Sequence, residues 1–463
     1  MMGTSTGSQS ANWRPVLALA LGLIVFYAAW VVLWGLDAHG YGEALRIYGI
    51  DPVIVRGYAA PLPFFDLQGV LSWPECARRG VDVLVSNPCD PIGRPANYSP
   101  LLAHPIFGGI GAARTLPLGF AIDLVILALL PFVIRPQNVP QLTVALLAAA
   151  SPAVLYALER CNIDVIVFAA LTFGILVAPK PVRHRISAAV GFLLGFVKFY
   201  PFCLLLLVLR ERLQIFLVAT VAAMAALGLF YFANHHAFQV MVFPGPDWFG
   251  DTFSARQVAD GLADLLKLQR ALVLPLLVIP AVLCARFAWR LSGRIAEALP
   301  RRAWDECDYQ LLLVGSVIIV SCFVLQSSLY YRALFLLAAL PGLWRLRDRA
   351  GPGLRRLIGW SIAGLIACLW AETVRTGLVQ IAGLIPAPAL RLAALKTVQV
   401  VILALREPLW WAEVTVLAGV VAAFLRQTPL IRLVMGLIQL KYGVSANGPV
   451  VVLAASHDPD RQT

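Results

Sequence analysis

Long apolar runs, separated by short polar segments, follow one another along most of the chain. The first extends from Val16 to Leu36, and further runs cover positions 116–134, 139–158, 163–178, 186–209, 309–326, 329–344 and 408–425. Apolar runs of about 17–25 residues, without the alternation of strands, are typical of membrane-spanning helices rather than of a membrane barrel. We therefore expect an all-α polytopic membrane protein with about nine or ten full spans and a few shorter, broken helices.

The composition agrees with a membrane location. Hydrophobic residues make up 60% of the 463 residues and charged residues only 13%, whereas a soluble domain is about 25% charged. The net charge of +12 is no signal of nucleic-acid binding, because the Lys and Arg residues lie in short clusters between the apolar runs. This pattern predicts membrane lipid, and not nucleic acid, as a partner.

The basic clusters predict how the spans are oriented. They follow the runs 163–178, 186–209 and 329–344, and cytoplasmic loops carry such an excess of Lys and Arg. The alternation of spans then places residues 37–97 in a first extracytoplasmic loop and residues 234–270 in a second. The first of these loops is long and apolar in patches, so we expect short helices at the membrane interface there.

The chain is expected to form a single transmembrane domain over residues 1–443, with a disordered tail at 444–463. We expect a multi-pass protein of the plasma (inner) membrane.

Two stretches interrupt the simple count of spans. The run 186–209 is broken by Lys198-Phe199-Tyr200-Pro201 into halves of about twelve residues, or about 18 Å of helix, which is short for a hydrocarbon core of about 30 Å. Two short helices that meet at a break near the outer side are predicted there, and a re-entrant hairpin is predicted at 98–112.

Eight cysteines occur, without a CxxC motif or a metal-type spacing of His and Cys, so no metal site is expected. Cys76 and Cys89 both lie in the first outer loop. They can form a disulfide if this loop is extracytoplasmic, or remain two free thiols. Trp73, in the same loop, is expected to act as an anchor at the membrane interface.

Polar residues at the ends of the apolar runs gather on the predicted outer face. Ionisable residues at membrane depth are costly and usually functional. An aspartate, several cations and several tyrosines at one face suggest a site for an anionic, lipid-borne substrate, with a carboxylate for acid–base chemistry. The cations would hold phosphate, Arg by bidentate contacts and Lys as a point charge. The residues in question are Asp37, Asn97, Tyr98, Arg160, Asn162, Asp164, Lys198, Tyr200, Tyr331 and Arg332.

Several of these residues belong to local patterns that occur in a particular order. The patterns are Asp37 followed by Gly49-Ile50-Asp51-Pro52, then Asn97-Tyr98-Ser99-Pro100-Leu101, then Arg160-Cys161-Asn162-Ile163-Asp164, then Gly191 and Gly195 before Lys198-Phe199-Tyr200-Pro201, and finally Tyr331-Arg332. In this order, over about residues 15–345, the chain resembles bacterial membrane glycosyltransferases of the GT-C superfamily. Within this superfamily it resembles the mannosyltransferase-like group that uses polyprenyl-phosphate sugars.

The resemblance implies a GT-C-like helix bundle and a reaction. A mannose-like hexose or a pentose would pass, with inversion, from a polyprenyl-phosphate donor to a glycan or glycolipid acceptor on the extracytoplasmic side, without a cofactor. Asp37 would be the general base. Donor phosphate would be held by Lys198, Arg332 and Arg160, and the substrates would also contact Tyr98, Asn97, Asn162, Asp164, Tyr200 and Tyr331.

Other interpretations of the same residues stay open. Asp37 can simply cap a helix, and Arg160 can pair with a neighbouring carboxylate. A transporter or lipid-linked-glycan flippase would show inverted repeats with broken helices in both halves, but the two broken stretches fall in the first half and no internal repeat is found. A ligase or polymerase of surface polysaccharide would use the same lipid-phosphate chemistry.

Overall fold

The computed structural model describes residues 13–53, 62–104, 109–241, 252–325 and 328–434. Within these ranges seven helices are long and apolar enough to cross a membrane, or up to eight if one bent pair counts as a span. The chain is therefore an all-α polytopic membrane protein, as its apolar runs predict. The seven are α1 (Arg14–Leu36), α4 (Thr115–Ile134), α9 (Leu213–Ala233), α13 (Val278–Ala298), α14 (Cys307–Leu325), α16 (Pro352–Gly383) and α17 (Pro388–Arg426).

The expected nine or ten full spans exceed the seven or eight that the described residues form. The reason is that several apolar runs are divided into segments that are too short to cross the membrane alone. One pair of helices bends by 46° at its break. The short segments are α5 (Val139–Ala149) and α6 (Pro152–Arg160), which form this pair, together with α7 (Ile163–Val177), α8 (Arg183–Gly195), the 3₁₀ helix η5 (Tyr200–Arg210) and α15 (Leu336–Arg349). Because these segments are too short to cross the membrane, the polar residues at their ends lie inside the bundle.

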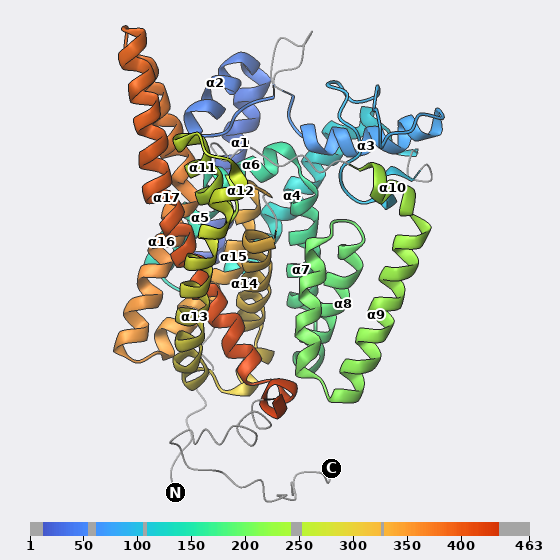
Figure 1. The fold of residues 1–463 in the computed structure, drawn as a ribbon, viewed down its shortest axis with the longest axis vertical. Coiled ribbons are helices and arrows are strands. Elements are labelled where there is room, and N and C mark those ends of the chain that lie inside the picture. Colours follow the sequence, from blue (N-terminus) through green and yellow to red (C-terminus); the bar gives the residue numbers. More distant parts are fainter. Residues whose placement is uncertain (1–12, 54–61, 105–108, 242–251, 326–327, 435–463) are drawn as a thin grey trace, which may run out of the picture.

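The two ends of the bundle differ in character. At one end, drawn at the top of Figure 1, lie the short helices α2 (Ala38–Tyr48), α3 (Phe65–Arg78), η1 (Pro100–Ala103), η3 (Ala112–Arg114), α10 (His235–Val240) and α11 (Gln257–Leu266). We call this the loop end. The opposite end, which we call the arginine-rich end, holds η4 (Lys180–Val182), η7 (Arg301–Asp305) and the turns that join α7 to α8, η5 to α9, α13 to α14 and α15 to α16.

The remaining elements connect the loop end to the bundle. The helical turns α12 (Arg270–Val273) and η6 (Leu274–Leu277) lead into α13, and η8 (Tyr330–Phe335) leads into α15. The strands β1 (Thr252–Phe253) and β2 (Ser328–Leu329) pair antiparallel, with Thr252 opposite Leu329. This pairing ties the second long loop to the residue that precedes η8.

The predicted break in the run 186–209 is confirmed. α8 ends at Gly195, and η5 begins at Tyr200 and packs back against it. A Cβ atom on Gly195 would lie 2.3 Å from the Phe202 ring, so only a residue without a side chain lets the two segments approach this closely. Lys198 is therefore held at the tip of a hairpin.

The first loop is a folded unit on the loop end. Cys76, on α3, forms a disulfide with Cys89, which settles the alternative that the sequence left open. Trp73 is 3% exposed and packs edge-on against Tyr98, so its expected role as an interface anchor is wrong. Within the predicted hairpin, residues 100–103 form the single turn η1, η3 begins at Ala112, and residues 105–108 lie outside the described part.

Candidate functional site

The centre of the candidate site is Asp164, in the first turn of α7. Asn162 caps this helix, because its Oδ1 accepts a hydrogen bond of 3.1 Å from the backbone N–H of Asp164. α7 has 15 residues, about 22 Å of helix, and is shorter than a hydrocarbon core of about 30 Å. Asp164 is consequently fully buried in the bundle rather than presented at its surface.

Two cations from different segments meet at the Asp164 carboxylate. Lys198 Nζ lies 2.8 Å from Oδ1, and Arg332 Nε lies 3.3 Å from Oδ2. Lys198 comes from the tip of the α8–η5 hairpin, and Arg332 comes from η8. All three side chains are buried, and buried charges persist only when they are paired. One carboxylate faces two cations, so this trio carries a net positive charge of one.

Asn162 joins the trio to the loop end. Its Oδ1 accepts a hydrogen bond of 2.8 Å from Lys198 Nζ. Its Nδ2 lies 2.7 Å from Asp66 Oδ2 and 2.9 Å from each of the hydroxyl groups of Tyr98 and Tyr331. An amide nitrogen has only two protons for these three acceptors, so the hydrogen bonds are shared among them.

Tyrosine rings cover the two cations. Lys198 Nζ lies 4.6 Å from the centroid of the Tyr98 ring, and the Arg332 guanidinium lies 4.9 Å from that of Tyr200. Contacts of this kind stabilise a cation that has left water. Burial raises the pKa of the Tyr98 phenol, which therefore keeps its proton and can donate a hydrogen bond at neutral pH. We refer to Asp66, Tyr98, Asn162, Asp164, Lys198, Tyr200, Tyr331 and Arg332 as the Asp164 cluster.

Asp66 is a member of the cluster that the sequence analysis missed. It lies in the first turn of α3, and Arg94 Nη1 is 3.2 Å from its Oδ1. Arg94 also pairs with Asp90 at 2.8 Å. The sequence held one signal for Asp66, since it directly follows the apolar patch Pro63-Phe64-Phe65 within a polar loop.

Asp37 stands apart from the cluster in its contacts. It lies at the junction of α1 and α2 and caps α2, because its Oδ1 accepts hydrogen bonds from the backbone N–H groups of His39 at 3.1 Å and Gly40 at 3.0 Å. The side chain is exposed and makes no hydrogen bond or ion pair to the Asp164 cluster within the described residues. The capping role is therefore present, and the catalytic role stays a prediction.

The other two predicted residues are Arg160 and Asn97, and Arg160 has contacts outside the Asp164 cluster. Arg160, at the end of α6, lies 3.1 Å from Glu159 and donates a hydrogen bond of 2.6 Å to the backbone oxygen of Asp51. It thereby links α6 to the segment that follows α2. Asn97 is half-buried and precedes Tyr98 in the first loop.

A second buried charged network, also missed by the sequence analysis, lies between α16 and α17. Arg406 pairs with Glu372 and with Glu407, and Arg375 pairs with Glu372. These four residues balance two positive against two negative charges. The neighbouring Thr373 donates a hydrogen bond of 2.7 Å to the backbone oxygen of Tyr48, which attaches the end of α2 to this part of α16. Its balanced charges indicate a structural role for this network.

The chain matches no family model, no curated protein and no solved structure. In the part of the chain that the structure describes, no three His, Cys, Asp or Glu side chains are grouped so that they could hold a metal ion.

Proposed function

We propose that the protein is an integral-membrane glycosyltransferase that moves a sugar from a polyprenyl-phosphate donor to an acceptor hydroxyl. The observation that carries this proposal is the convergence of Lys198 and Arg332 on a single buried carboxylate, Asp164. Ionisable groups at membrane depth are usually functional, and two buried cations that meet at one point can bind an anion. A lipid phosphate is the anion most accessible to a site within a membrane protein.

The electrostatics of the trio fit the departure of a phosphate. A sugar linked to a polyprenyl phosphate is a phosphodiester with one negative charge. Attack by the acceptor oxygen forms a bond to the anomeric carbon and breaks the bond from this carbon to the phosphate oxygen, so the leaving polyprenyl phosphate gains a second negative charge. Fixed cations at the point where charge develops lower the barrier.

Arg332 has a donor available for this phosphate. Its Nη1 is buried and has no hydrogen-bond partner among the described residues. A buried donor without a partner costs about 1–3 kcal/mol, so an acceptor at this point would stabilise the site. A phosphate oxygen satisfies this donor, and the charge on both partners strengthens the bond.

Two carboxylates compete for the role of the base that takes the proton from the acceptor hydroxyl. Asp37 is the base that the family resemblance implies, and its Oδ2 is not used in capping α2. Asp66 is favoured by position, because it shares Asn162 with Lys198. We assign the role of the base to Asp37. Asp66 is the alternative, and one variant of each residue distinguishes the two.

The orientation of the bundle supports a site that opens to the extracytoplasmic side. The positive-inside rule places the arginine-rich end in the cytoplasm. The loop end then faces the oxidising compartment, which agrees with the disulfide between Cys76 and Cys89. The donor would enter from the membrane and the acceptor from the loop end.

The experiment that tests the proposal is sugar transfer by the purified protein in liposomes that contain a polyprenyl-phosphate sugar. We expect the sugar to appear on the acceptor, and we expect no movement of intact donor between leaflets beyond that in protein-free liposomes. Translocation of intact donor without transfer would overturn the proposal in favour of a flippase.

A further inference from the structure

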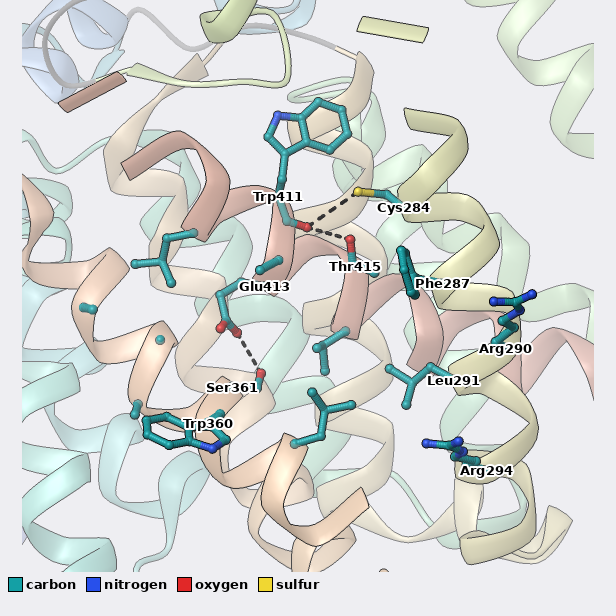
Figure 2. A pocket seen from close by; sticks show the side chains of 17 residues that line it. Cys284, Phe287, Arg290, Leu291, Arg294, Trp360, Ser361, Trp411, Glu413 and Thr415 are labelled. Atoms are coloured by element: carbon teal, nitrogen blue, oxygen red, sulfur yellow. Dashed lines mark hydrogen bonds between the residues drawn. The ribbon is translucent and has the colours of Figure 1, made fainter. Parts of the chain in front are cut away.

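A long apolar cleft runs along the outside of the bundle between α13 and α16, with α17 as its floor (Figure 2). Its volume is about 900 Å³. The wall is mainly aliphatic and aromatic, and its larger apolar side chains are Phe287, Leu291, Leu357, Trp360, Leu409 and Trp411. No residue of the Asp164 cluster lines this cleft, so it is a separate site.

The cleft has the length of one leaflet. Along α13 its lining extends from Cys284 to Arg294, which is ten residues apart and about 15 Å of helix. Half of a hydrocarbon core of about 30 Å has the same depth. On α16 and α17 the lining residues, positions 357–367 and 409–416, lie in the halves of these helices that lead to the arginine-rich end.

Two arginines line the cleft on α13, and Arg294 is the last lining residue toward the arginine-rich end. Arg290 and Arg294 are one helical turn apart, and Figure 2 shows both on α13 at the side of the cleft. Both are exposed, and neither forms an ion pair with a carboxylate in the described ranges. Trp360 lies across the cleft from Arg294 and is 71% exposed. Exposed Trp and snorkelling Arg are typical of the headgroup level of a membrane protein.

The single carboxylate in the wall does not oppose these arginines. Glu413, on α17, accepts a hydrogen bond of 2.7 Å from Ser361 Oγ on α16, and Figure 2 shows its side chain directed toward that hydroxyl. Glu413 is 5% exposed and so is turned away from the surrounding lipid. The charge that the mouth of the cleft presents outward is therefore positive.

We propose that this cleft binds one phospholipid with an anionic headgroup, taken from the leaflet at the arginine-rich end. An acyl chain fills the apolar cleft, and the headgroup phosphate accepts hydrogen bonds from Arg290 and Arg294. Arg forms bidentate, charge-assisted bonds to phosphate, and two of them one turn apart can hold a single headgroup. The bound lipid fills the space between α13 and α16.

The test is native mass spectrometry of the purified protein with phosphatidylglycerol and with phosphatidylcholine of the same acyl chains. We expect wild type to retain one phosphatidylglycerol in preference to phosphatidylcholine. Arg290→Gln with Arg294→Gln should weaken phosphatidylglycerol retention by about tenfold or more, because each charge-assisted hydrogen bond contributes substantially. Arg212→Gln is the matched control, since this exposed arginine is at the same end but precedes α9 and does not line the cleft.

A second variant tests the cleft itself. Ala363 is an exposed lining residue on α16, so Ala363→Trp fills the cleft without entering the core. We expect this variant to lose lipid retention while both arginines are present. Equal retention of the two lipids by wild type, or unchanged retention in both the arginine and Ala363→Trp variants, would overturn the proposal. Sugar transfer is measured separately, so this outcome leaves the proposed enzymatic function unaffected.

Discussion

Lys198 and Asp164 are joined by a buried ion pair of 2.8 Å, although one lies at the tip of a broken hairpin and the other at the start of α7. Arg332 adds a second cation to the same carboxylate. Because charges this deep are retained only when they are compensated, the three segments that carry them are fixed relative to one another. This fixed pair of buried cations is the basis of the proposed phosphate site.

Removing the charge of Asp164 should strongly destabilise the protein. Asp164→Asn leaves Lys198 and Arg332 buried without their counter-ion, and we expect the free energy of unfolding in mixed micelles to fall by about 3–5 kcal/mol. Asp348→Asn is the control, because its ion pair with Arg347 is exposed and should contribute about 0–1 kcal/mol. Similar effects of the two substitutions would show that the cluster does not hold these segments together.

The base can be identified by two substitutions that preserve shape. Asp37→Asn keeps an oxygen that can cap α2, so the protein should fold and should bind polyprenyl phosphate as wild type does. We expect its rate of sugar transfer to fall by about 10²–10⁴-fold, the usual contribution of a general base. Full activity in Asp37→Asn, with loss in Asp66→Asn, would move the role to Asp66.

The orientation can be tested at Cys89. After reduction of its disulfide with Cys76, we expect a membrane-impermeant maleimide added to intact cells to label Cys89. Cys76→Ser provides the same free thiol without a reductant, and Cys89→Ser in that background is the control for specificity. Labelling that appears only after the cells are opened would place the loop end in the cytoplasm.

Stability should depend on pH through Glu211, at the arginine-rich end between η5 and α9. A hydrogen bond from Arg185, 2.6 Å away, is the main cause that lowers the pKa of Glu211 below its ordinary value of 4.5, and His184 also contacts it. A carboxyl with a lowered pKa contributes stability above its unfolded pKa and loses it as the pH falls through the folded pKa. The advantage of wild type over Glu211→Gln in thermal midpoint should therefore be full at pH 7 and shrink below about pH 4.5. A constant difference at every pH would contradict this.

Of the ten polar residues that the sequence places at one face, seven meet in the Asp164 cluster, whereas Asp37, Asn97 and Arg160 do not belong to it. Lys198, Asp164 and Arg332 end or interrupt short apolar runs, and membrane geometry brings such positions to a common depth. Asp66 was missed because a lone charge in a long loop does not differ from a solvated one until α3 packs against the cluster.

The network of Glu372 and Arg406 was missed for a related reason. These residues lie within helices of 32 and 39 residues, and the pattern of the chain does not reveal which face of such a helix is covered by its neighbour. Buried charges occur in both halves of the chain, so the placement of polar groups does not distinguish an enzyme from a transporter. The lack of a recognised internal repeat in the sequence still favours an enzyme over a transporter.

The most direct test of the central claim is the rate of sugar transfer from a polyprenyl-phosphate sugar by wild type and by Lys198→Gln. Loss of a cation that stabilises the leaving phosphate should lower the rate by about 10²–10³-fold. Lys180→Gln, an exposed lysine at the arginine-rich end, should transfer sugar at the wild-type rate. A folded Lys198→Gln variant that transfers sugar as fast as wild type would contradict the assignment of the Asp164 cluster as the phosphate site.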